Sequence, residues 1–403
     1  MIRSSRLVLP ALMAALTAAG ALTLPPLGDE TPSSALSASS IEPVALKRAA
    51  PRAALRVVPA AVGQSKSGTS GLTPFEAFFA PAQAGRPVLV QRMGTTGWQT
   101  VGRTTQDARG RAMVYAKQPP STSYRAVAPA YRGARPVVSP KVQLPAWSMA
   151  FRDDFSGTHL DTTKWAYRQL GVKPYGNRMC SQSRENAVSV SGGRLHLRVY
   201  KLSSLAGATK RKCPHGFFAN GHISTINDGT DTRNAAIGGG FTMKYGVLSA
   251  RMRFPHAAGQ HGSFWSQALS GGVTGNPAAD GAEIDTAEYY GDGRRDGGLS
   301  HLVHWHTAAG ALHSSGGVVN ADRLLPPGQE WSSAMHVYSV QWSPTGYVFR
   351  VDGHETFRTT KGVSKVPQFL ILSLLTSDWE LPRLKAPYGQ MDVDWVRVWT
   401  PPQ

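Results

Sequence analysis

The segment Met391-Asp-Val-Asp-Trp-Val-Arg-Val-Trp399 holds nine residues without Gly or Pro and is rich in β-branched and aromatic side chains, a composition typical of a strand. Similar runs precede it at 187–190, 194–199, 245–254, 336–342 and 347–352, whereas helical periodicity is nearly absent after residue 146. Roughly 250 residues of strand and turn exceed what a small barrel needs. They predict an all-β, two-sheet sandwich over 148–400, whose curved inner sheet could form a cleft.

A second, smaller β unit is predicted upstream. Short alternating runs at 87–91, 97–102, 112–115 and 124–128 recur about every ten residues and are separated by turns, which is the pattern of a small sandwich. We therefore assign 69–134 to an accessory domain that resembles immunoglobulin-like modules of exported bacterial enzymes. The Pro-rich stretches 39–68 and 135–147 are interpreted as linkers, the first also as a disordered lead-in.

The beginning of the chain predicts export. Two Arg residues precede an apolar run over 7–24, and small residues cluster over 33–40, so 1–38 is interpreted as a signal peptide. A retained membrane anchor is the alternative interpretation. Only two cysteines are present, Cys180 and Cys213, and neither has metal-ligand spacing. An oxidising, extracellular location predicts one structural disulfide between them, with the protein secreted or held at the cell surface.

The net charge of +18 raises the question of a polyanionic partner. Residues 39–145 hold 15 Lys and Arg against three Asp and Glu, so this excess is concentrated upstream of the large domain. Nucleic-acid-binding motifs are missing from the sequence, and nucleic acid is not expected as a partner. We predict that the basic accessory domain binds an anionic cell-surface polymer and that the chain is a monomer.

The chemistry is expected in Gly281-Ala-Glu-Ile-Asp-Thr-Ala-Glu-Tyr289. Glu283 and Asp285 are two apart and share a face of a strand, whereas Glu288 should point the other way. One extra residue, a β-bulge at Thr286-Ala287, would return Glu288 to the same face. Retaining glycosidases need two carboxyls about 5–5.5 Å apart, one ionised and one protonated. The alternative is a solvated strand face with scattered charge.

This motif is similar to the Glu-x-Asp-x-x-Glu motif of glycoside hydrolase family 16 in its bulged, laminarinase-like form. Further segments that resemble the family in order and spacing are 151–157, 160–165, 223–225, 244–255, 336–342, 351–353 and 391–399. The resemblance implies a concanavalin-like jelly roll with a cleft across its concave sheet. It also implies that Glu283 is the nucleophile, Asp285 the assisting acid and Glu288 the general acid/base.

Two segments depart from the family pattern, and both are expected to line the cleft. His261 occupies the place where a sugar-stacking Trp is expected, and 376–380 replaces a glycine-rich turn. Trp265 and Trp379 are candidate stacking platforms, with a place in the core as the alternative. His304 and Trp305 are also candidate substrate contacts, although strand alternation puts them on opposite faces.

No cofactor is expected to be required. The three His at 301, 304 and 306 suggest a metal site, but their spacing along one strand supports a pair at best. The family resemblance also allows a structural calcium ion near Asp394, without a dense acidic loop to hold it.

Several functions fit this pattern. The first is an endo-acting hydrolase of β-1,3 or mixed β-1,3-1,4 glucan that uses double displacement. The second keeps the site but acts on galactan or another cell-wall glycan, or works as a transglycosylase. The third is a non-catalytic carbohydrate-binding protein, which the clustered carboxyls disfavour.

Overall fold

The computed structural model describes residues 50–57, 73–116, 122–143, 148–173, 176–232, 240–269, 274–291 and 298–401. The predicted signal peptide and most of the predicted lead-in lie outside these residues. Among the described residues, none of the helices combines the length and apolar character needed to cross a membrane.

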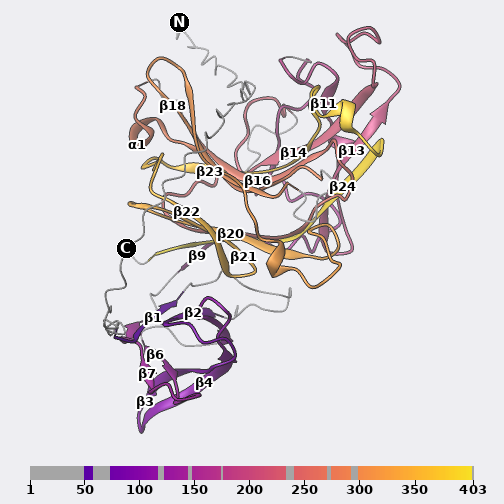
Figure 1. Cartoon of the computed structure of the whole chain (residues 1–403). Helices are drawn as coiled ribbons and strands as arrows, with labels where there is room; N and C mark the ends of the chain where they lie inside the picture. Colours follow the sequence, from indigo (N-terminus) through magenta and orange to yellow (C-terminus); the bar gives the residue numbers. More distant parts are fainter. Residues whose placement is uncertain are drawn as a thin grey trace, which may run out of the picture. The chain divides into compact units, whose positions relative to one another are not determined.

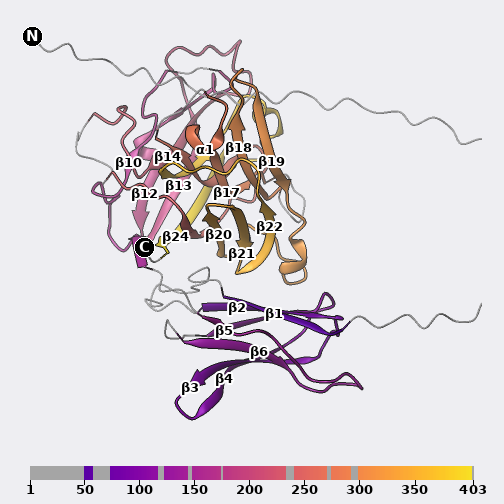
Figure 2. The same cartoon turned by 90° about the vertical axis from the view of Figure 1, so that its left-hand side faces the viewer.

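The small N-terminal unit is a sandwich of two antiparallel sheets, one with the order β1-β2-β5 and the other β4-β3-β6-β7, with β8 also paired to β6 (Figure 2). Its core contains Leu55, Phe75, Val88 and Val90. Its strands are β1 (Arg52–Val57), β2 (Thr73–Ala80), β3 (Pro87–Gly94), β4 (Gly97–Thr105), β5 (Arg111–Ala116), β6 (Ser123–Ala128), β7 (Val137–Val138) and β8 (Val142–Gln143).

Strands lie outside the predicted bounds of this unit, 69–134, at both ends. Strand β1 lies inside the stretch interpreted as a lead-in, and β7 and β8 lie inside the stretch interpreted as a linker. Leu55 is buried in the core of the unit, and Val137 and Val142 pack against it. An Ala/Arg-rich edge strand and two-residue strands between prolines carry too little alternation to be recognised from sequence. The immunoglobulin-like character of the unit stays a prediction.

The large domain is the predicted two-sheet jelly-roll sandwich, and its two layers are seen one above the other in Figure 1. Its strands follow the order β19-β18-β17-β16-β23-β14-β13-β24-β15-β20-β21-β22. Strand β14 belongs to both layers, because Val199–Leu202 of β13 pair with its first half and Ile371–Leu374 of β23 with its second. The pairings between neighbours in this order are antiparallel, while the short β11 adds to β14 in parallel.

The elements of the large domain have the following bounds. They are β9 (Ser148–Asp153), β10 (Ala166–Tyr167), β11 (Ser181–Ser183), η1 (Glu185–Ala187), β12 (Val188–Ser191), β13 (Arg194–Leu202), β14 (Phe217–Ser224), β15 (Gly246–Arg253), β16 (His261–Ala268), α1 (Pro277–Asp280), β17 (Glu283–Tyr289), β18 (Ser300–His306), β19 (Leu312–Val318), η2 (Asp322–Leu324), β20 (His336–Ser343), β21 (Gly346–Val351), β22 (His354–Thr359), β23 (Gln368–Leu375), η3 (Leu381–Arg383) and β24 (Tyr388–Thr400).

The core lies between the two layers and is formed by alternate side chains of facing strands. Phe264, Ile284 and Leu372 come from one layer, and Val340 and Val398 from the other. Trp165, Trp331, Trp342 and Trp395 are among the largest fully buried side chains. These four Trp residues are therefore structural.

Cys180 and Cys213 form the predicted disulfide, with their Cα atoms 5.4 Å apart. Both side chains are buried next to the loop that follows β23, since the carboxylate of Asp378 accepts hydrogen bonds from the backbone N–H groups of Met179 and Cys180. The bond links residues separated by 33 positions and restricts the unfolded chain accordingly.

Replacing both cysteines by Ala is expected to lower the free energy of unfolding by about 2–4 kcal/mol. Urea unfolding of the variant under oxidising conditions measures this difference. Treatment of the wild type with a reductant should reproduce it, whereas equal stability of the reduced and oxidised wild type would contradict the expectation.

Candidate active site

The local sequence positions β17 by a tight turn and a short helix. The Asn276 side chain accepts a hydrogen bond from the backbone N–H of Ala278 and caps α1. Gly281 then leaves the helix with φ of +88°, and a Cβ at this position would lie only 2.3 Å from the Cβ of Ala268. Only glycine fits this close approach, so β17 starts at Glu283 in a fixed register against β16.

The predicted bulge at Thr286-Ala287 is confirmed. On the β16 side, Trp265 pairs with Asp285 and Phe264 with Ala287, so Thr286 has no pairing partner. On the β18 side, the register shifts between Asp285 and Glu288 in the same way. Ile284 and Ala287 both face the core, and the extra residue turns the three acidic side chains to the opposite, cleft-side face.

His301 supports the bulge and was missed as a functional candidate by sequence reasoning, which considered it only for metal binding. Its Nδ1 donates a hydrogen bond to the Thr286 carbonyl at 2.8 Å, and its Nε2 lies 2.8 Å from the Thr356 hydroxyl. Burial lowers the pKa of His301 to about 4, so the ring is neutral at physiological pH. His301 and His304 have opposite orientations on β18, so the three His at 301, 304 and 306 do not form one ligand set.

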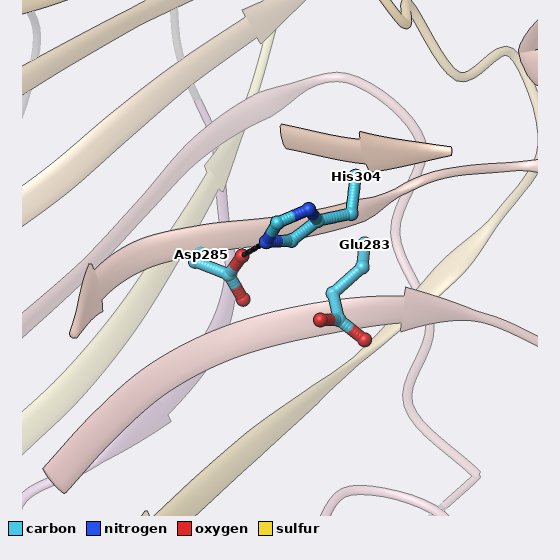
Figure 3. A group of neighbouring side chains, drawn as sticks. All are labelled: Glu283, Asp285 and His304. Atoms are coloured by element: carbon cyan, nitrogen blue, oxygen red, sulfur yellow. Dashed lines mark ion pairs between the residues drawn. The ribbon is translucent and has the colours of Figure 1, made fainter. Parts of the chain in front are cut away.

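The acidic residues are held close to two imidazoles. Asp285 is 2% exposed and Glu288 8%. Nε2 of His261 lies 2.8 Å from Oε1 of Glu288, and Nε2 of His304 lies 3.5 Å from Oδ2 of Asp285. Figure 3 shows the His304 ring turned toward the Asp285 carboxyl, with Glu283 beside them. The Nδ1 of His304 is hydrogen-bonded to the Ser314 hydroxyl at 2.6 Å.

Burial and mutual repulsion set the protonation of this acid cluster. Burial, followed by the negative charge of Glu288, raises the pKa of Glu283 to about 7. Burial and the charges of both glutamates raise the pKa of Asp285 well above its usual range. Burial would also raise the pKa of Glu288, but the charge and hydrogen bond of His261 outweigh it, and the net shift is downward. The cluster therefore retains protons at neutral pH, preferentially on Asp285.

The candidate aromatic contacts divide between the face that carries the acids and the core. Trp265 pairs with Asp285 and is half-buried on the face of the acids, where its Nε1 donates to the Ser373 hydroxyl at 3.1 Å. Trp379 is 45% exposed, and its ring centroid lies 6.1 Å from that of Tyr290. Trp305 was among the candidate substrate contacts, but the structure places it elsewhere. It lies on the other face of β18, packs against the core and stacks on His313.

Tyr290 is a further residue beside the acids that sequence reasoning did not single out. Its ring stacks on His261 with centroids 4.4 Å apart, and its hydroxyl is hydrogen-bonded to Glu288. Its position two residues after Glu288 was a usable signal, because residues two apart share a strand face.

The residues around Asp394 do not fit the calcium ion that the family resemblance allows. One carboxylate oxygen accepts a hydrogen bond from Arg251 at 2.7 Å, and the other lies 3.9 Å from Nε of Arg194. These two guanidinium groups already neutralise the negative charge of the carboxylate, so a bound cation beside it is disfavoured. Elsewhere, Glu283, Asp285 and His304 bring donor atoms within 4.8 Å of one another. Acid–base chemistry accounts for this group without a metal, and the expectation that no cofactor is required stays a prediction.

Comparison with known families identifies the family of this chain. The sequence model of glycosyl hydrolases family 16 matches residues 178–397. The chain belongs to glycosyl hydrolases family 16. This family 16 chain is therefore a glycoside hydrolase, and the non-catalytic binding protein considered above is the wrong class.

One curated protein and several solved structures are similar to part of this chain. Glucan endo-1,3-beta-glucosidase A1 from Niallia circulans is 28% identical over 223 residues, which are 53% of this chain and 29% of that protein. The chain thus spans less than a third of the length of this curated relative. Among solved structures, the catalytic domain of an endo-1,3-beta-glucanase (laminarinase) from Thermotoga petrophila RKU-1 aligns with a TM-score of 0.48 at 20% identity, covering 64% of this chain and 100% of that one. The endo-beta-1,3-glucanase from Pyrococcus furiosus aligns with a TM-score of 0.47 at 19% identity, and the alignment covers 64% of this chain and 95% of that one.

Proposed function

We propose that this family 16 enzyme is a secreted, retaining endo-β-glycosidase that hydrolyses β-1,3 or mixed β-1,3-1,4 glucan. The observation that carries the proposal is the bulge in β17, which brings Glu283, Asp285 and Glu288 to one face of the sheet. A regular strand would separate Glu288 from the other two. A partly buried group of three carboxyls serves acid–base and nucleophilic chemistry rather than sugar recognition.

The arrangement supports double displacement in two steps. In the first, Glu283 attacks the anomeric carbon in its ionised form while the glycosidic C–O bond breaks, and the leaving oxygen takes a proton from Glu288. Because the charge of His261 lowers the pKa of Glu288, while burial and the charge of Glu288 raise that of Glu283, this step requires the proton of the pair to lie on Glu288 when the substrate reacts. In the second, Glu288 accepts a proton from water, the water oxygen attacks the anomeric carbon, and the bond to Glu283 breaks. Asp285, whose pKa is raised by burial and by its two acidic neighbours, keeps its proton and so limits the negative charge of the cluster.

The glucan preference rests on the curated relative, which is named a glucan endo-1,3-beta-glucosidase. The same site acting on galactan or another wall glycan is the second candidate. It is favoured by His261, since an imidazole paired to a carboxylate occupies the place where the family resemblance predicts a sugar-stacking Trp. Transglycosylation uses the same covalent intermediate, with a sugar hydroxyl in place of water.

Export is proposed on the signal-like start of the chain and is supported by the Cys180–Cys213 disulfide, since disulfides persist in oxidising compartments. Binding of an anionic surface polymer by the basic N-terminal unit and a monomeric state stay predictions.

A substrate panel and product stereochemistry test the proposed activity. Reducing-sugar release should be highest on laminarin or lichenan and low on agarose, carrageenan and xyloglucan. Proton NMR during the reaction should show the β-anomer of the new reducing end first, because two inversions at the anomeric carbon retain its configuration. An initial α-anomer would exclude the two-step mechanism, and a preference for agarose or carrageenan would favour the second candidate. Oligosaccharides longer than the substrate would reveal transglycosylation.

A further inference from the structure

His261 is in direct contact with the proposed acid/base, Glu288. Its Nε2 lies 2.8 Å from Oε1 of Glu288 and 2.9 Å from the hydroxyl of Ser263. The Tyr290 ring stacks on the imidazole at an interplanar angle of 17° and fixes its plane. Both members of the His261–Glu288 pair are largely shielded from solvent, so their interaction is weakly screened.

The register of β16 and β17 creates this pair. Ser263 is the cross-strand partner of Glu288, and His261 lies two residues before Ser263 on the same face. This diagonal position is within reach of a long side chain from the neighbouring strand. His261 therefore contacts Glu288 through one nitrogen that can either donate a hydrogen bond or accept one.

The charged and titratable groups around His261 come from several elements. Carboxylates of Glu288, Glu283 and Glu380 act on the ring from β17 and from the loop after β23, and the positive charge of Arg178 opposes them. Burial alone would lower the pKa of His261, but Glu288, with support from Glu380, outweighs burial and raises it. The imidazolium is thus the favoured form of His261 beside an ionised Glu288.

We propose that His261 is the positioning residue of Glu288 and that the two side chains hold one proton between them in the resting enzyme. The inference rests on the proposed function, since it assigns Glu288 as acid/base. At rest this proton lies on Nε2 of His261 beside the ionised Glu288. In the first step the proton passes to Glu288 and from Glu288 to the leaving oxygen, which leaves His261 neutral and Glu288 ionised. In the second step Glu288 takes a proton from the attacking water and returns it to Nε2 of His261.

The test is the pH dependence of kcat/KM in a His261→Gln variant. Gln keeps a hydrogen-bond donor but carries no charge and does not titrate. A cation beside Glu288 and Glu283 favours their ionised forms and lowers both pKa values, so its removal raises both. The bell-shaped profile on the best polysaccharide is therefore expected to move to higher pH by roughly one unit or more. A profile at the wild-type pH would overturn the proposal.

A second substrate separates proton sharing from a merely structural role. A β-glycoside with a dinitrophenolate leaving group needs no proton from Glu288, so its kcat/KM should respond much less to His261→Gln than that of the polysaccharide. Equal losses on both substrates would indicate a disordered cleft and contradict the proposal.

His196→Gln is the matched control, because His196 forms a comparable 2.7 Å pair with Asp392 away from the acid cluster. Its profile should not move.

An NMR titration provides a readout that does not depend on activity. The His261 ring should titrate above the range of a free histidine in the wild type and fall in Glu288→Gln, where its anionic partner is gone. An unchanged titration would contradict the pairing even if His261→Gln fails to fold.

Failure of the proposed function and failure of the His261 proposal can be told apart. Full activity of Glu283→Gln overturns the proposed function. A wild-type pH profile of His261→Gln, together with an inactive Glu283→Gln, overturns only the role of His261.

Discussion

A Glu283→Gln variant is expected to lose roughly 10⁴-fold or more in kcat on the polysaccharide, because the amide cannot form the covalent bond to the anomeric carbon. Its fold should be preserved. Glu283 lies in a cluster where burial and the charge of Glu288 raise its pKa to about 7, so a neutral side chain relieves repulsion. The variant should therefore unfold at a temperature equal to or above that of the wild type.

Reducing-sugar assays and thermal unfolding of the same preparation check both parts of this expectation. Glu185→Gln is the matched control, since Glu185 is an exposed glutamate of η1 outside the site. It should keep wild-type turnover. Turnover of Glu283→Gln within about tenfold of the wild type would remove Glu283 from the role of nucleophile.

Deletion of Thr286 is expected to abolish turnover and also to destabilise the large domain. The deletion removes the extra residue of the bulge, so strand alternation would direct Glu288 into the position of Ala287 against the core. A carboxyl buried there without a partner costs about 3 kcal/mol or more of unfolding free energy. The Thr286 carbonyl that accepts the His301 hydrogen bond is removed as well.

Thr286→Ala separates the presence of the extra residue from the chemistry of its side chain. The Thr286 hydroxyl is buried without a hydrogen-bond partner among the described residues, so its removal should change the unfolding free energy by no more than about 1 kcal/mol. Activity should stay close to that of the wild type. Urea unfolding and turnover of the two variants decide the question: a deletion variant with the stability and activity of Thr286→Ala would show that the bulge does not position Glu288.

The alternation of side chains along a strand made much of the site predictable, because residues at even spacing share a face and residues at odd spacing do not. Glu283 and Asp285 share a face by spacing alone, and the odd offset of Glu288 required a bulge, which the register of β17 against both neighbours confirms. The same alternation correctly placed His304 and Trp305 on opposite faces, although both were taken as candidate substrate contacts. Trp305 packs against the core.

Sequence patterns were less informative where strands are short or lack alternation. Strand β1 and the two-residue strands β7 and β8 were interpreted as parts of linkers, because their pairing depends on partners elsewhere in the small sandwich. Whether the calcium ion that the family resemblance allows near Asp394 can bind also depends on the surroundings of this carboxylate. Arg194 and Arg251 approach this carboxylate from the neighbouring strands β13 and β15. The sequence around Asp394 does not predict these two ion pairs.

By itself, the sequence determined the all-β class, the disulfide and the identity of the three acids, because composition, cysteine number and strand periodicity are local properties of the chain. Only the tertiary structure decided which histidine contacts each acidic side chain. His261 reaches Glu288 through the register of β16 against β17, and His304 reaches Asp285 from β18. Such contacts arise from hydrogen-bond ladders between strands distant in sequence, and the protonation of a carboxyl depends on the charges and burial that these ladders bring to it.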